Sequence, residues 1–206
     1  MDYSNQMLPS AYCPYNFAFK THNTDPMIKR LLWGLLALVV SFFVYAGYTI
    51  STTRSHSPEA VSSLVIDRDT ISVAYCQPFK KGRVIFGGLV PYGEYWRTGA
   101  NEPTRIHFSR DVIFGEQKVF AGTYRLYTIP GKENWKVVLN TELEKWGYYE
   151  PNYSLDVASI EVPVSYIKDE QEQFQVSLRL ESDTVLMELS WDNVLVTVPF
   201  GLSLEG

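Results

Sequence analysis

A run of twenty uncharged residues near the N-terminus constrains this chain more than any other feature. It extends from Leu31 to Ile50 and directly follows the basic pair Lys29 and Arg30. A helix of this length, at about 1.5 Å per residue, spans a hydrocarbon core of about 30 Å. The run is apolar on all sides, whereas a helix of a soluble domain normally keeps a polar face. The sequence therefore predicts a transmembrane helix.

Basic residues flank this segment unequally. Lys20, Lys29 and Arg30 precede it, and only Arg54 follows closely. The positive-inside rule then keeps the N-terminus in the cytoplasm. The predicted organisation is a poorly ordered cytoplasmic segment over residues 1–30, the transmembrane helix over 31–50, a linker over 51–60 and one extracytoplasmic domain over 61–206.

Two interpretations of the apolar segment stay open. As a retained signal anchor, it makes the chain a single-pass membrane protein with a cytoplasmic N-terminus. If translation begins at Met27 instead, Leu31–Tyr45 has the character of a signal-peptide core and Ala46 ends a small-x-small cleavage site, so the domain is secreted or periplasmic. The length of the leader and of the apolar run favours the anchor, and both interpretations export the domain.

The exported part, Ser51–Gly206, is long enough for one hydrophobic core. The whole chain carries a formal charge of −5 and its first fifty residues contribute +1, so the exported part carries −6. Nucleic acid is therefore excluded as a partner. Lys80, Lys81 and Arg83 cluster beside a turn, which is typical of a solvated loop rather than of a phosphate site.

The chain has two cysteines, Cys13 and Cys76. The predicted topology places them on opposite sides of the membrane, which excludes a disulfide between them. Cys76 ends an apolar run without a basic partner nearby in sequence, so we expect a packed, inert thiol rather than a nucleophile.

Period-two alternation dominates the exported part. Apolar residues at 174, 176, 178 and 180 alternate with polar ones, which predicts a half-buried strand. Val185–Trp191 and Val194–Phe200 repeat the pattern, and Ser182-Asp183 and Asp192-Asn193 suggest turns between them. These features predict a meander of three antiparallel strands at the C-terminus.

Further extended runs precede this meander, and no long helical period follows residue 51. They are Ile71–Tyr75, Thr104–Ser109, Thr123–Ile129, Trp135–Asn140 and Leu155–Val164. About eight to ten short strands separated by turns are typical of an antiparallel β-sandwich or a jelly roll. The predicted fold class is therefore all-β, preceded by one N-terminal transmembrane helix.

Residues 82–102 interrupt this rhythm with five glycines and a proline. Tyr92, Tyr95 and Trp96 are too apolar to be left wholly in water, so we expect the loop to fold back on the sheets. A long ordered loop is a common place for function.

Three runs of the exported part carry a family resemblance: GRVIFGGLVPYGEYWRTGANEPT from Gly82, AGTYRLYTIPG from Ala121, and Trp146-Gly147. Over most of residues 57–200 the chain resembles an uncharacterised family of exported bacterial proteins, domain of unknown function 2911. The resemblance implies an exported β-rich domain and no activity. Relatives often have Tyr-Ser-Arg-Pro where this chain has Tyr75-Cys76-Gln77-Pro78, so no ligand role is carried over to Gln77.

The loop also contains the candidate binding residues. An arginine presents five donors in a rigid fork that suits carboxylates and phosphates, and aromatic walls with a few polar groups suit a sugar, a peptide end or a small acid. The candidate ligand-binding residues are Arg83, Tyr92, Trp96, Arg97, Asn101 and Glu102. The pattern favours a purely structural interpretation over a ligand site: Arg97 pairs with Glu94 or Glu102, Asn101 satisfies a turn, and Trp96 is core.

No catalytic motif accompanies this loop. His107 lies on the polar side of the Thr104–Ser109 run, so we expect it in solvent rather than in a site. No His, Cys, Asp or Glu residues have the spacing of a zinc site. The sequence motifs of common hydrolases, nucleoside triphosphatases and dinucleotide-binding enzymes are also absent. We therefore predict neither a metal nor a cofactor.

The sequence favours a binding domain whose partner is a small polar ligand, a glycan or an envelope protein. An enzyme of unrecognised type, with Glu102, Glu94 or His107 as acid or base, is the first alternative. A structural protein that assembles through an exposed sheet edge is the second.

Overall fold

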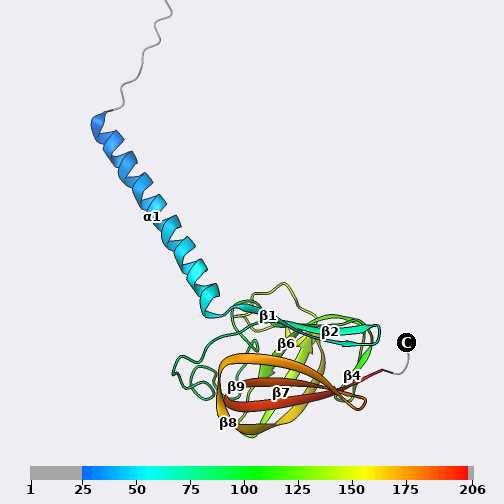
Figure 1. Ribbon diagram of the computed structural model, residues 1–206. Helices are drawn as coiled ribbons and strands as arrows, with labels where there is room; N and C mark the ends of the chain where they lie inside the picture. The colour runs from blue at the N-terminus through cyan, green and yellow to red at the C-terminus, as the bar shows by residue number, and fades with distance from the viewer. Residues whose placement is uncertain (1–24, 204–206) are drawn as a thin grey trace, which may run out of the picture. The chain divides into compact units, whose positions relative to one another are not determined.

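The computed structural model describes residues 25–203 (Figure 1), except the side chains of residues 50–54. The predictions for Cys13 and for residues 1–24 of the cytoplasmic segment lie outside this range. The chain divides into two compact units, residues 1–47 and 48–206. The first unit, where it is described, consists of one helix, and the second contains the sheet.

The helix α1 extends over Pro26–His56. Asp25 caps it, because its carboxylate accepts a hydrogen bond of 3.1 Å from the Met27 amide, and Pro26 occupies the first helical position, where no amide hydrogen is needed. Pro26–Thr49 is long and apolar enough to cross a membrane. An apolar N-terminal helix is therefore confirmed, and both a membrane anchor and a signal sequence have this character.

The expected linker over residues 51–60 is mostly regular structure. The helix continues to His56 and the first strand begins at Glu59, so only Ser57 and Pro58 separate them.

The second unit is an antiparallel sheet of nine strands, in the order β1-β2-β3-β6-β7-β8-β9-β4-β5. The strands are β1 Glu59–Ile66, β2 Asp69–Cys76, β3 Arg105–Phe108, β4 Val112–Phe114, β5 Gln117–Val119, β6 Gly122–Ile129, β7 Asn134–Asn140, β8 Asp156–Glu181 and β9 Thr184–Leu202, with a 3-10 turn at Tyr153–Leu155. The predicted all-β class is confirmed.

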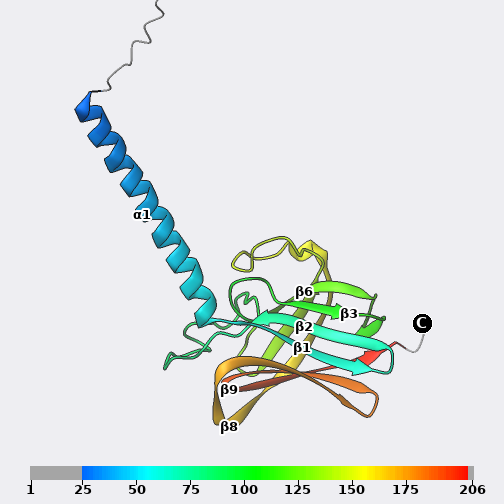
Figure 2. The ribbon, with the colours of Figure 1, turned by 45° about the horizontal axis from the view of Figure 1, so that its top comes forward.

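Strand β8 folds this sheet over on itself. Its first part pairs with β7 up to Pro163, and from Val164 onward it pairs with β9. The register shifts twice, between Tyr166 and Gln171 and again before Gln175, and the strand turns there from one layer into the other (Figure 2). Both layers then turn an apolar face toward the same core.

The core between the layers is rich in aromatic side chains. Trp135 of β7, Phe174 of β8 and Trp191 of β9 are almost fully buried. Trp96, from the loop between β2 and β3, stacks on Trp191 with ring centroids 5.9 Å apart and packs edge-on against Phe174. The loop therefore belongs to the core, as its aromatic residues predict.

The predicted turn at Asp192-Asn193 is wrong, because β9 is one continuous strand. Val185 to Trp191 bury their odd-numbered side chains, and Val194 to Phe200 bury the even-numbered ones. Asp192 has a positive φ of 56°. The register shifts opposite Asp192 form a bulge in which β8 carries the extra residues, and the inward set of β9 changes by one position there without ending the strand.

Candidate functional site

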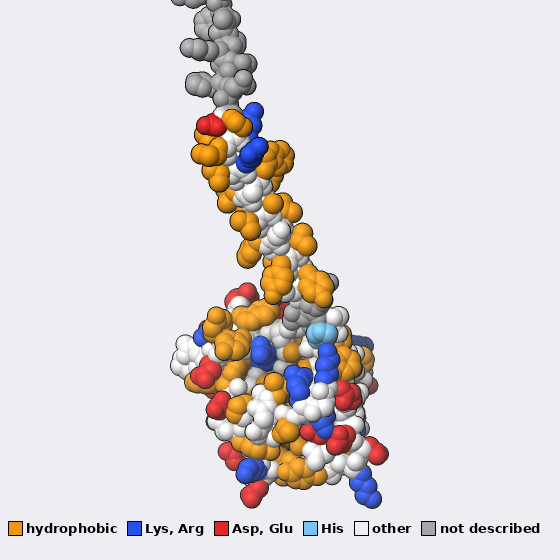
Figure 3. All heavy atoms as spheres, turned by 90° about the vertical axis from the view of Figure 1, so that its left-hand side faces the viewer, with side chains coloured by type: hydrophobic (Ala, Val, Ile, Leu, Met, Phe, Trp, Pro, Cys, Tyr) orange, Lys and Arg blue, Asp and Glu red, His pale blue; other side chains and the backbone are white. Residues whose placement is uncertain are grey.

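A hollow of about 440 Å³ in the sheet domain is called the main cleft here. It lies beside the loop of residues 77–104. Figure 3 faces this loop and shows Lys and Arg side chains among hydrophobic ones. The lining residues are His56, Ser57, Pro78, Lys81, Arg83, Leu89, Val90, Trp96, Arg97, Gly99, Ala100 and Trp191. Every charged residue in this lining is cationic.

The floor of the main cleft is aromatic. Trp96 and Trp191 are stacked with an interplanar angle of 17°, and both rings are buried in the core. The Trp96 indole donates to the Gly99 carbonyl over 3.2 Å, which fixes the ring against its own loop. Trp96 is therefore a core residue that also lines the main cleft.

Arg97 forms the inner cationic wall. Its guanidinium donates to the Asn101 carbonyl over 3.3 Å and lies 5.9 Å from the centre of the Tyr148 ring. Burial lowers the pKa of Arg97, and the nearby charge of Arg125 lowers it further, although nearby Tyr95 and Tyr148 act the other way. Among the described residues Arg97 has no carboxylate partner, so the expected ion pair with Glu94 or Glu102 does not form.

Lys81 and Arg83 form the outer wall, at the start of the same loop. The Lys81 ammonium lies 3.0 Å from Nδ1 of His56. The Arg83 guanidinium donates to the backbone carbonyls of Lys80 and Phe79. Neither side chain meets a carboxylate within the described part of the chain.

Some other cations of the domain contact carboxylates. Lys80, next in sequence to Lys81, contacts Glu170 at 2.6 Å and Asp192 at 2.8 Å. Arg110 and Arg179 likewise contact acidic side chains. The side chains of Lys81, Arg83 and Arg97 thus lack carboxylate partners in the described part of a domain that has a surplus of acidic residues.

A second hollow of about 250 Å³ lies between β1, β2 and the end of the loop. Its lining includes Glu59, Cys76, Glu102 and Arg105. The Cys76 thiol donates to a Glu102 carboxylate oxygen over 3.3 Å. Burial, and then the Glu102 carboxylate, raise the pKa of Cys76 to about 11. The thiol therefore stays protonated at neutral pH, and the expectation of a buried lone thiol is confirmed.

The structure separates the six predicted binding residues. Arg83, Trp96 and Arg97 line the main cleft, whereas Glu102 lines the second hollow. The two remaining residues, Tyr92 and Asn101, line neither of them: Tyr92 is partly exposed beneath the Lys132 ammonium, and Asn101 has a positive φ of 56° and offers its carbonyl to Arg97.

Trp191 and Lys81 are among the main-cleft residues that the sequence prediction missed. Trp191 reaches the main cleft from β9 only because β8 folds the sheet over, which no local pattern reveals. Lys81 belongs to the basic cluster that the sequence assigns to a solvated loop, and only its lack of a carboxylate partner distinguishes it from Lys80.

Arg125 of β6 is another residue that the sequence prediction missed. Its side chain is fully buried and donates to the Tyr95 hydroxyl, to the Tyr149 carbonyl at 2.7 Å and to the Lys145 carbonyl at 3.4 Å. Its Nε atom has no hydrogen-bond partner among the described residues. A buried charge of this kind fastens residues 141–152 to the sheet beside Arg97.

The candidate acids and bases do not meet. His107 is exposed on β3, as expected, with its ring 3.0 Å from the Thr123 hydroxyl. Glu94 is exposed in the loop, and Glu102 faces Cys76. Within residues 25–203 no group of three or more His, Cys, Asp or Glu side chains is placed to hold a metal ion.

Comparison with known proteins gives one match. The family model described as "Protein of unknown function (DUF2911)" matches residues 57–200, which include every strand from β1 through most of β9. No curated protein and no solved structure matches the chain. The matched range contains nearly all of the lining of both hollows.

Proposed function

The chain belongs to this family of proteins of unknown function, and we propose from the geometry of its sheet domain that it binds a small organic anion in the main cleft. One observation carries the proposal. The side chains of Lys81, Arg83 and Arg97 line a hollow of about 440 Å³ and have no carboxylate partner among the described residues, while no acidic residue lines it. The Glu172 carboxylate accepts a hydrogen bond of 2.9 Å from the backbone amide of Lys81, not from its ammonium.

The chemistry of the lining favours a carboxylate. Arginine forks match the two oxygens of a carboxylate, and the partly buried position of Arg97 strengthens such a bond because water competes less. The apolar walls, formed by Leu89, Trp96 and Trp191, suit a ligand with a hydrocarbon or ring portion. Glu94, Glu102 and His107 do not line this cleft, which is why binding is proposed rather than catalysis.

The location of the domain is part of the proposal. Lys20 precedes the apolar stretch of α1, Pro26–Thr49, and the basic residues Lys29 and Arg30 lie near its start. The positive-inside rule therefore supports a retained anchor with the sheet domain outside the cytoplasm. The ligand is then a small acid of the extracytoplasmic space.

Titration of the full chain, purified in an uncharged detergent, with small carboxylates tests the proposal. Ligand binding is measured by calorimetry or by ligand-detected NMR. We expect Arg97→Gln to weaken carboxylate binding about tenfold to a hundredfold, because it removes a charge-assisted hydrogen bond.

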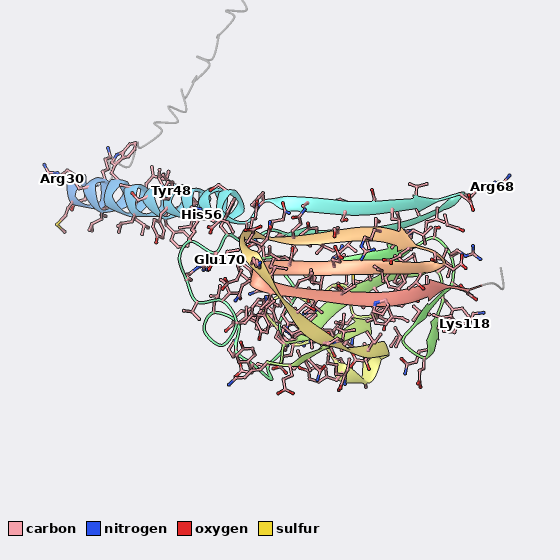
Figure 4. All side chains as sticks on the ribbon, turned by 60° about the horizontal axis from the view of Figure 1, so that its bottom comes forward. Arg30, Tyr48, His56, Arg68, Lys118 and Glu170 are labelled. Carbon is pink, nitrogen blue, oxygen red and sulfur yellow. The ribbon has the colours of Figure 1, made fainter. Side chains whose placement is uncertain are left out.

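Arg68→Gln is the matched control. Arg68 lies at the end of the sheet domain opposite Glu170 (Figure 4), and Glu170 contacts Lys80, the neighbour of Lys81. We expect this variant to bind like the natural chain. Equal affinities of both variants and the natural chain for every carboxylate would contradict the proposal.

A further inference from the structure

We propose that the main cleft continues past Arg97 into a subsite for a six-membered ring, so that the ligand is a cyclic acid. This inference rests on the proposed binding of an anion. It adds the ring to which the charged group of the ligand is attached. The subsite is a third hollow of about 140 Å³, lined by Leu89, Val90, Pro91, Tyr95, Trp96, Arg97, Gly147 and Tyr148.

The two hollows are neighbours. Leu89, Val90, Trp96 and Arg97 line both of them. Arg97 therefore stands between the two spaces, where its guanidinium can hold a carboxylate whose ring extends to the other side. The volume also fits, since a cavity of about 150 Å³ holds one benzene molecule.

The walls of the subsite suit the flat face of a ring. Tyr148 is 69% exposed, and its ring faces the Arg97 guanidinium at 5.9 Å. Leu89 and Pro91 add apolar surface. The Tyr95 hydroxyl donates to the Gly147 carbonyl over 2.8 Å, and these two polar groups lie at the edge of the subsite. An aromatic ring and a pyranose both match such walls, because each stacks its apolar face on a tyrosine.

The loop that carries Tyr148 is held in place. Arg125 binds the carbonyls of Lys145 and Tyr149 on either side of it. Gly147 lies so close to the main loop that an added Cβ would stand 2.6 Å from the Asn101 carbonyl oxygen. The Tyr148 ring is exposed, and its backbone is held in place by these contacts. The ring is therefore a preformed wall of the subsite rather than part of a mobile loop.

Three probes separate the charge from the ring: acetate, phenylacetate and glucuronate. Each is titrated into the full chain in an uncharged detergent, and its affinity is measured by ligand-detected NMR. We expect at least one ring acid to bind more tightly than acetate. Tyr148→Ala removes the contact of Arg97 for every probe but the stacking partner for the ring acid alone, so we expect it to weaken that ring acid about threefold to tenfold more than it weakens acetate.

Phe120→Ala is the matched control. Phe120 is 67% exposed and has the Lys118 ammonium 5.8 Å from its ring, as Tyr148 has Arg97. Lys118 lies at the end of the domain opposite Glu170 (Figure 4). We expect Phe120→Ala to bind all three probes like the natural chain.

The outcomes distinguish the two proposals. If no probe binds, or binding ignores Arg97→Gln, the proposed anion site is wrong. If acetate binds through Arg97 but neither ring acid exceeds it, or Tyr148→Ala affects all probes equally or none, the subsite alone is overturned. A gain confined to phenylacetate identifies an aromatic acid, and a gain confined to glucuronate identifies a sugar acid.

Discussion

Cys76 shows how a single neighbour decides the chemistry of a residue. Its thiol is buried and donates to the Glu102 carboxylate. Because a negative charge opposes the formation of a thiolate, the two effects together place the pKa of Cys76 at about 11. At pH 8 only about one thousandth of such a thiol is ionised, and only the thiolate reacts with alkylating agents.

We expect iodoacetamide to modify Cys76 slowly at pH 8 and faster as the pH rises toward 11. Glu102→Gln should speed the reaction, since it removes the negative charge and thereby lowers the pKa of Cys76. Mass spectrometry of the peptide that contains Cys76 measures the rate and keeps it separate from Cys13. Glu94→Gln, in an exposed part of the loop, serves as control. A rate that does not respond to Glu102→Gln would refute this mechanism.

The same group links stability to pH. The thiol titrates at a higher pH in the folded chain than in the unfolded one, so its contribution to stability is complete below the unfolded pKa and declines as the pH rises toward about 11. Burial also raises the pKa of Tyr127, whose hydroxyl donates to Asp156 over 2.8 Å. Both groups therefore favour unfolding in strong alkali.

At the scale of elements, β9 shows where the sequence prediction succeeds and where it fails. The alternation identifies both apolar sets, and the Ser182-Asp183 turn between β8 and β9 is confirmed. Asp192-Asn193 has the chemistry of a turn, but a bulge uses the same residues because both need a positive φ. Local sequence does not distinguish the two, since the difference depends on whether a partner strand continues alongside.

The bulge can be tested at Asp192 with two substitutions. Asp192→Asn and Asp192→Ala both remove the carboxylate that contacts Lys80, but only Asn readily adopts a positive φ. We expect Ala to be less stable than Asn by about 1 kcal/mol. The free energy of unfolding, measured by chemical denaturation, gives the difference. Equal stabilities would show that the backbone of Asp192 carries no strain penalty.

Residues 141–152 depend on Arg125 as their anchor. Arg125→Ala removes hydrogen bonds to two carbonyls and leaves a cavity, and we expect it to reduce the free energy of unfolding by about 2–4 kcal/mol. Trypsin should also cut the variant faster at Lys145.

Arg105 offers a matched comparison. It pairs with Arg125 in register on β3 and donates to the Leu143 carbonyl over 3.1 Å, but its side chain is exposed. Arg105→Ala should change stability by less than about 1 kcal/mol. If the two variants are equally stable, Arg125 does not fasten the loop.

At the scale of the molecule, the division into a helix and a sheet domain follows from the sequence, because an apolar run and period-two alternation are both local signals. The main cleft does not follow in the same way. Arg83, Trp96 and Arg97 lie together in the sequence and were found, whereas Trp191 joins them through the fold of β8. Prediction of a site from one segment therefore recovers one wall of it.

The two units should also separate physically. The buried hydrophobic residues lie between Ile71 and Phe200, so a chain of residues 55–206 retains the whole core. We expect it to fold without detergent, with a far-UV circular dichroism spectrum typical of β-sheet and a Tm within a few degrees of the full chain. Failure of this shorter chain to fold would show that the helix stabilises the sheet.

The path of β8 determines how late in the chain the second layer of the core is supplied. Trp96 comes early in the chain, but the aromatic rings that pack on it from the other side of the core, Phe174 and Trp191, are supplied by β8 and β9. A chain made from its N-terminus therefore holds its aromatic half-core open to water until the last two long strands arrive. During synthesis the unfinished domain therefore exposes apolar surface and is vulnerable to aggregation. The vulnerability ends when β9 pairs with β8 and covers this surface.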